Sequence, residues 1–119
     1  MGARVGWPLV ALLVTAGGAL AGHGWDSYDD TRGMSLKGTI HSTGYERPYV
    51  TMMLDVEKPQ PRTWTVVLGK PSRLEAKGVA VSSLVPGTVV AVHVYPSRDV
   101  PDECRAVRIT LGGKTTELW

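Results

Sequence analysis

Apolar and polar residues alternate along most of the chain after residue 33, with a period of two rather than the 3.6 of an amphipathic helix. Val50, Met52, Leu54 and Val56, for example, alternate with mostly polar neighbours. This pattern is typical of antiparallel strands that bury one face. We expect such strands over 36–41, 50–57, 63–68, 88–95 and 106–111, with a short sixth strand over 114–118 after the Gly112-Gly113 turn.

The alternation also predicts which side chains form the core. Trp64 is expected to be buried, and it is expected to pack with Leu54, Val66, Val92 and Ile109. In the fifth strand, Val107, Ile109 and Leu111 are expected to face inward.

A helical signal interrupts the strands after residue 71. Ser72-Arg73-Leu74-Glu75 fits a capping box, and Gly78 is placed to end a short helix in the left-handed conformation. Three strands, a helix and two further strands is the element order of an OB-fold. We therefore expect residues 34–119 to form an all-β, mainly antiparallel domain: a five- to six-stranded OB-like barrel with one short helix between strands 3 and 4. Another small barrel or an open meander with the same element order is the alternative.

The first 21 residues predict an export signal. Arg4 precedes a mainly apolar run over 5–16, and Ala19-Leu20-Ala21 fits a signal-peptidase site. The alternative is an uncleaved membrane anchor, but the run is shorter than the roughly 20 apolar residues that a spanning helix needs. We therefore expect cleavage and no membrane span in the protein that remains. His23 stands where a lipoprotein would carry its cysteine. The sequence thus predicts a periplasmic or secreted protein, cleaved after Ala21 or Gly22, in which residues 22–33 form a loose N-terminal arm.

The net charge and the reactive residues argue against several classes of function. Of the 13 Lys and Arg residues only Arg4 lies in the signal. The chain after the signal therefore has twelve basic and eleven acidic side chains, a net charge of +1. That balance argues against a nucleic-acid binder. Cys104 is the only cysteine, which excludes an internal disulfide and predicts an inert, partly buried thiol. No serine lies in a nucleophile-elbow context, and no catalysis is expected.

The expected barrel places two loops beside the usual binding face of an OB-fold. The loop after the first strand carries Tyr45, Arg47 and Tyr49, and the loop after the fourth carries Tyr95 and Arg98. Aromatic faces and guanidinium groups together favour anions, sugars or peptides. The sequence therefore predicts an exported binding or interaction module for a small anionic ligand or a protein partner, with these five residues as its site if the two loops converge.

The chain also resembles a family of small exported bacterial proteins known only as a domain of unknown function. The resemblance rests on five motifs in order: His23-Gly24-Trp25, Leu36-Lys37-Gly38-Thr39-Ile40, Leu54-Asp55-Val56, 64–71 (WTVVLGKP) and Leu84-Val85-Pro86-Gly87. It implies a signal peptide and an OB-like barrel, and it implies no activity. The family's paired histidines after the signal are represented here by Gly22-His23, and its loop histidine is replaced within Arg47-Pro48-Tyr49.

A metal site is the second hypothesis. Cleavage after Gly22 would leave His23 at the N-terminus, where its amine and ring nitrogen can chelate copper, and imidazole also suits zinc. Asp26 is the nearest further ligand, and Asp29, His41 or His93 are more distant alternatives. His41 and His93 are expected on the outward faces of separate strands, so the sequence does not bring them together.

Overall fold

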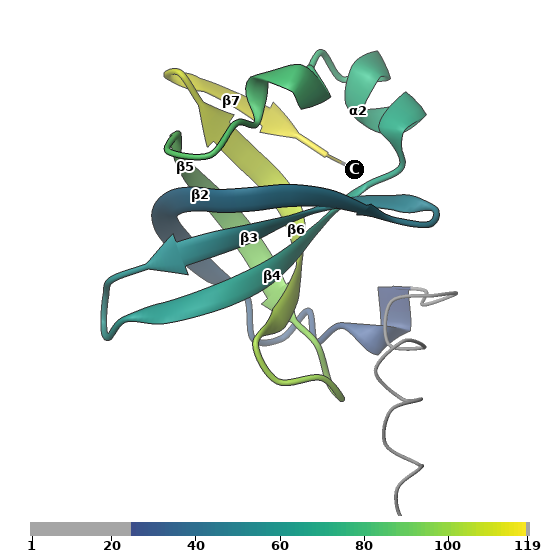
Figure 1. Cartoon of the computed structure of the whole chain (residues 1–119). Coiled ribbons are helices and arrows are strands. Elements are labelled where there is room, and N and C mark those ends of the chain that lie inside the picture. Colours follow the sequence, from purple (N-terminus) through teal and green to yellow (C-terminus); the bar gives the residue numbers. More distant parts are fainter. Residues whose placement is uncertain (1–24, 119) are drawn as a thin grey trace, which may run out of the picture.

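The computed structural model describes residues 25–118, and within them the chain forms a closed β-barrel (Figure 1). The barrel is made of five strands with an additional strand beside it. The elements in chain order are η1 (Trp25–Ser27), β2 (Met34–Glu46), β3 (Tyr49–Val56), β4 (Arg62–Gly69), α2 (Pro71–Ala76), η2 (Val81–Ser83), β5 (Val89–Pro96), β6 (Glu103–Leu111) and β7 (Lys114–Glu117). The described part of the chain contains no helix long and apolar enough to cross a membrane.

The strand order is that of an OB-like barrel, as the element pattern predicts. Neighbouring strands run β4-β3-β2-β5-β6-β7, and a parallel pairing of β4 with β6 closes the barrel. This pairing joins Thr65 to Glu103 and Val67 to Arg105. The remainder of β6 pairs with β7 along the same edge, so β7 lies outside the closed barrel.

Strand β2 is longer than the predicted 36–41 because it serves two partners. Its first half pairs with β5 and its second half with β3, around a register shift between Ile40 and Ser42. At Gly38 the backbone of β3 comes so close that a Cβ atom would lie 2.4 Å from the carbonyl oxygen of Asp55. A glycine is therefore required where the strand coils between its two neighbours.

The predicted core residues are buried, with two exceptions. Trp64, Leu54, Val66, Val92 and Ile109 all belong to a single apolar cluster. Both exceptions, Val107 and Leu111, lie in β6. This strand begins at Glu103 rather than at the predicted Ala106.

A register shift between β5 and β6 occurs next to Val107, so the inward positions of β6 run Cys104, Ala106 and Ile109. Val107 and Leu111 are only half-buried. The prediction that Val107 faces inward was wrong because a bulge inserts one extra residue and reverses the alternation.

The helix α2 begins earlier than the predicted capping box. Its N-cap is Lys70, which makes no side-chain cap hydrogen bond, and Pro71 occupies the first turn. The capping box at Ser72 was wrong because proline, with its φ fixed near the helical value, starts the helix two residues sooner, with Lys70 rather than Ser72 as the N-cap.

The helix end is as predicted. Gly78 has φ +85°, and the Val79 amide donates to the Leu74 carbonyl at 2.8 Å. Leu74 and Val79 are both buried, so this turn fixes α2 to the core.

The two ends of the barrel differ. In Figure 1, α2 and η2 lie across the upper end, whereas the β5–β6 loop and residues 25–33 lie at the lower end. Leu74 and Leu84, on and after α2, are buried in the core. The helix α2 therefore covers one end of the barrel, whereas the β5–β6 loop and the segment that contains the short η1 lie at the other end, which we call the open end.

Candidate functional site

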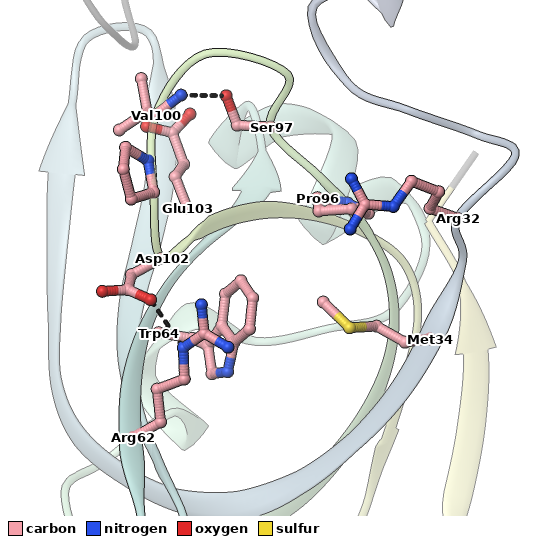
Figure 2. Close-up of a pocket in the computed structure, with 10 residues that line it drawn as sticks. Arg32, Met34, Arg62, Trp64, Pro96, Ser97, Val100, Asp102 and Glu103 are labelled. Atoms are coloured by element: carbon pink, nitrogen blue, oxygen red, sulfur yellow. Dashed lines mark hydrogen bonds and ion pairs between the residues drawn. The ribbon is translucent and has the colours of Figure 1, made fainter.

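A cavity of about 230 Å³ lies at the barrel end opposite α2 (Figure 2). Its walls come from residues 32–34 at the start of β2, from the start of β4, and from the loop between β5 and β6. The lining residues are Arg32, Met34, Arg62, Trp64, Pro96, Ser97, Val100, Pro101, Asp102 and Glu103.

The start of β4 provides the aromatic and cationic part of this cavity. Arg62 and Trp64 are two residues apart on one strand, so their side chains leave the same face. The Arg62 guanidinium carbon lies 4.3 Å from the centre of the Trp64 ring, a cation–π contact. Figure 2 shows the guanidinium in front of the ring, with Met34 on the other side of the opening.

The turn before β6 holds the Arg62 side chain in place. Arg62 Nε donates a 2.6 Å hydrogen bond to Asp102 Oδ1. Asp102 has φ +63°, and its carbonyl oxygen accepts from the Thr65 amide at 2.8 Å. The carboxylate is therefore fixed by a backbone contact to the strand that carries Arg62.

The segment before β2 forms the rim of the cavity, and it is bound to the barrel rather than loose as predicted. The Asp29 amide donates to the Pro96 carbonyl at 2.8 Å, and the Arg98 amide donates to the Ser27 carbonyl at 3.0 Å. The Tyr28 backbone forms an isolated antiparallel bridge with Ser97. Composition alone did not anticipate this docking, because the contacts are made mainly by backbone groups.

A turn within this segment positions Arg32. Asp29 Oδ1 accepts hydrogen bonds from the Thr31 amide and hydroxyl, and the Arg32 amide donates to the Asp29 carbonyl. The hydrogen bonds from Thr31 hold the pKa of Asp29 below its ordinary value, with smaller contributions from the charges of Arg98 and Arg32. The turn thereby places a guanidinium group beside the cavity.

A buried polar cluster lies next to the cavity. The Tyr28 hydroxyl donates a 2.6 Å hydrogen bond to Glu103 Oε2, and both residues are almost fully buried. Burial, together with the Glu103 carboxylate, raises the pKa of Tyr28 far above its ordinary value. Two residues further along β6, Arg105 lies 5.1 Å from the Tyr49 ring centre, and burial lowers the pKa of Arg105 against the opposing effect of Tyr49.

The five residues predicted as a ligand site are not gathered into one cluster. Tyr49 and Tyr95 both adjoin Arg105, Tyr49 through its ring and Tyr95 as its cross-strand partner. Tyr45 and Arg47 are exposed at the β2–β3 hairpin. In Figure 1 this hairpin projects sideways, away from the β5–β6 loop.

Arg98 is occupied by the N-terminal segment. Its Nε donates to the Asp26 carbonyl at 3.0 Å, and a terminal nitrogen lies 3.9 Å from Asp29 Oδ2. The β5–β6 loop lines the cavity through Ser97, Val100, Pro101 and Asp102, and Arg98 is not among the lining residues. The signal that could have revealed the site is the Arg-x-Trp pair at the start of a strand.

The described part of the structure provides no support for the predicted metal site. His23 lies outside the described residues, and Asp26 is exposed in η1. No group of three or more His, Cys, Asp or Glu side chains between residues 25 and 118 could hold a metal ion. His41 Nδ1 pairs with Asp55 Oδ2 at 3.1 Å and His93 Nδ1 with Ser35 Oγ at 3.2 Å. The copper or zinc site at His23 stays a prediction.

Comparison with known proteins places the chain in a family. The sequence profile of a family of unknown function, DUF6152, matches residues 10–104. The chain belongs to the DUF6152 family. The match ends at Cys104, so most of β6, which closes the barrel of this DUF6152 protein, lies beyond it.

Part of a larger protein of known structure has a similar fold. A crystal structure of TiaS in complex with an isoleucine tRNA and ATP matches this DUF6152 chain with a TM-score of 0.53 at 15% identity. The match covers 71% of this chain and 19% of that one. At this identity the likeness shows the fold alone. The search of curated proteins gives no significant match.

Proposed function

We propose that this DUF6152 protein is an exported binding module that takes a small ligand in the cavity at the open end of its barrel. The observation that carries the proposal is the fixed guanidinium of Arg62, held between the Trp64 ring and the Asp102 carboxylate at the wall of a 230 Å³ cavity. Binding sites are typically concave and combine apolar walls with a few fixed polar groups. Export rests on the sequence of residues 1–21.

The single thiol of the chain is not available as a catalytic nucleophile. Cys104 is fully buried in the core, and burial raises the pKa of its thiol well above the ordinary value. A nucleophilic cysteine needs the opposite, a lowered pKa and access to substrate. The polar groups of the cavity are suited to holding a ligand in one orientation.

Ligand-detected NMR with a library of small fragments of mixed charge tests the proposal. The mature protein is compared with Met34→Trp, which places a large ring in the cavity mouth, and with Met53→Trp, which adds the same ring to the outer face of β3. Met53 is exposed and does not line the cavity, so it is the matched control. Circular dichroism of both variants confirms that they fold.

The proposal predicts fragments that bind the wild type and Met53→Trp but not Met34→Trp. If Met34→Trp does not fold, Val100→Trp blocks the same cavity from the β5–β6 loop. A library with no binders, or binders unaffected by both blocking variants, contradicts the proposal.

A further inference from the structure

We infer that the barrel-end cavity takes a small organic anion, with an oxyanion head on the terminal N–H groups of Arg62 and an apolar body against Trp64 and Met34. This inference rests on the proposed function, because it names the ligand class of the same cavity. Four observations lead to it: the fixed plane of Arg62, its unused donors, the charge distribution of the lining, and the apolar walls.

The Arg62 guanidinium is held in one orientation before any ligand arrives. The Trp64 ring supports its face at 4.3 Å, and the Asp102 carboxylate accepts from Nε at 2.6 Å. A guanidinium that is already ordered loses less side-chain entropy on binding than a free one. Although the Arg62 side chain is 44% exposed, it therefore has a contact both on its face and on its Nε edge.

The remaining donors of Arg62 are available to a ligand. The hydrogen bond to Asp102 uses the Nε edge, and the two terminal nitrogens make no hydrogen bond to any residue in the described part of the chain. Two parallel N–H groups match the two oxygens of a carboxylate or the oxygens of a phosphate or sulfate ester. The shared chemistry is an oxyanion head.

Among the described residues around the cavity, the cation at its rim, Arg32, has no carboxylate partner. Asp102 is engaged with Arg62, and the Glu103 carboxylate accepts from the Tyr28 hydroxyl. The Arg32 side chain lines the cavity without a direct hydrogen bond or ion pair to another residue among 25–118. An anion between Arg32 and Arg62 would therefore meet two guanidinium groups, only one of which has a carboxylate partner.

Part of the remaining lining is apolar and can pack against an apolar body of modest size. Trp64 is 6% exposed, and Met34 and Val100 are half-buried around the opening. The volume of 230 Å³ is below the roughly 300–1,000 Å³ of sites for drug-sized ligands, so a single-ring or short-chain molecule is the appropriate size.

Isothermal titration calorimetry with benzoate and its neutral isostere benzamide tests the inference. Both probes carry the same ring, and only benzoate carries the oxyanion. The mature protein is expected to bind benzoate at least about tenfold more tightly than benzamide, the factor expected for a charge-assisted hydrogen-bond pair. Phenyl phosphate and phenyl sulfate then distinguish a carboxylate site from one for phosphate or sulfate esters.

Variants of two arginines assign the effect to the cavity. Arg62→Gln should weaken benzoate by about tenfold while leaving benzamide nearly unchanged, and Arg62→Lys should restore part of the loss by restoring the charge without the planar fork. Arg108→Gln is the matched control, because Arg108 is 45% exposed against 44% for Arg62 and is also paired with a carboxylate, yet it lies outside the cavity.

The outcomes separate the inference from the proposed function. Equal affinity for benzoate and benzamide, both blocked by Met34→Trp, overturns the anion class and leaves the binding module standing. Loss of benzoate binding in Arg108→Gln as large as in Arg62→Gln also overturns the inference. No binding of either probe, together with an empty fragment screen, overturns both.

Discussion

At the scale of single residues, Trp64 takes part in both the core and the cavity. Its side chain is 6% exposed, it lies opposite Leu54 in the β3–β4 pairing, and one ring face supports Arg62. The period-two pattern predicted its burial correctly. The pattern could not predict its contact with Arg62, because that contact depends on where the barrel ends relative to the strand.

The core role of Trp64 has a measurable cost. Trp64→Ala should lower the free energy of unfolding by about 3–5 kcal/mol, since it removes a large buried ring and leaves a cavity. Chemical denaturation of the mature protein measures the change. A loss below about 0.5 kcal/mol, the range of surface substitutions, would contradict the burial of this ring.

Asp55 provides a prediction on pH. The Thr63 hydroxyl donates to Asp55 Oδ1 at 2.7 Å, and this bond, followed by His41, holds the pKa of the carboxyl below its ordinary value. A carboxyl with a lowered pKa in the folded state stabilises the fold above its unfolded pKa, and this contribution is lost as the pH falls through the folded value.

Thr63→Val should therefore raise the pKa of Asp55 toward its ordinary value and reduce the loss of stability on acidification. NMR titration of the carboxyl carbon measures the pKa directly. Thr31→Val, which removes a hydroxyl that donates to Asp29, is the control and should leave Asp55 unchanged. An unchanged pKa of Asp55 in Thr63→Val would contradict this role of the hydrogen bond.

At the scale of elements, close approach of backbones decides what the strands tolerate. Gly38 and Gly44 lie on the same strand, β2, yet an added Cβ would come within 2.4 Å of the Asp55 carbonyl oxygen at Gly38 and no closer than 3.6 Å to its neighbours at Gly44. The first distance forces the backbones apart, and the second is an ordinary contact.

Gly38→Ala should thus destabilise the protein by about 1–3 kcal/mol, as expected when an added methyl group forces a shift in a packed structure. Gly44→Ala should change the free energy of unfolding by less than about 0.5 kcal/mol. Thermal and chemical unfolding of the two variants provide the comparison. Equal effects would show that β2 does not depend on the close approach at Gly38.

The elements also show what alternation can and cannot predict. Most inward positions follow from period two, because each strand buries one face against a common core. The pattern failed in β6 because a bulge next to Val107 changes the alternation, and bulges leave no mark in a run such as Ala106-Val107-Arg108. It failed at α2 because the fixed φ of Pro71 outweighed the side-chain cap of Ser72.

At the scale of the whole molecule, the segment before β2 completes the barrel end. Tyr28 is 2% exposed and donates to the buried Glu103 carboxylate, which links this segment to β6 across 75 residues of sequence. The sequence predicted a loose arm because residues 22–33 are polar and rich in glycine and aspartate. The cavity site was missed for a different reason, because its walls come from segments far apart in the chain.

Removing the Tyr28 hydroxyl tests this link. Tyr28→Phe should cost about 1.5–3 kcal/mol, the range for a hydrogen bond to a charged group, because the Glu103 carboxylate stays buried. Tyr45→Phe is the control, because the Tyr45 side chain is exposed and its change should stay within about 0.5 kcal/mol. A Tyr28→Phe protein as stable as wild type would show that the hydroxyl contributes nothing to the link.

Export is tested by the intact mass of the protein recovered from the periplasm or medium. We expect residues 1–21 to be absent, with the new N-terminus at Gly22 or His23. Recording the same mass with added Cu(II) tests the metal hypothesis at His23. A protein that is exported with residues 1–21 intact would contradict the cleaved signal.

The most direct test of the binding site is an NMR titration of the mature, ¹⁵N-labelled protein with benzoate. We predict that the largest shifts occur at the indole N–H of Trp64, the Nε–H of Arg62 and the amide of Asp102, which line the cavity at the open end of the barrel. Shifts confined to the β2–β3 hairpin, at Tyr45 and Arg47, would instead place binding on the exposed loop and would contradict the cavity as the site.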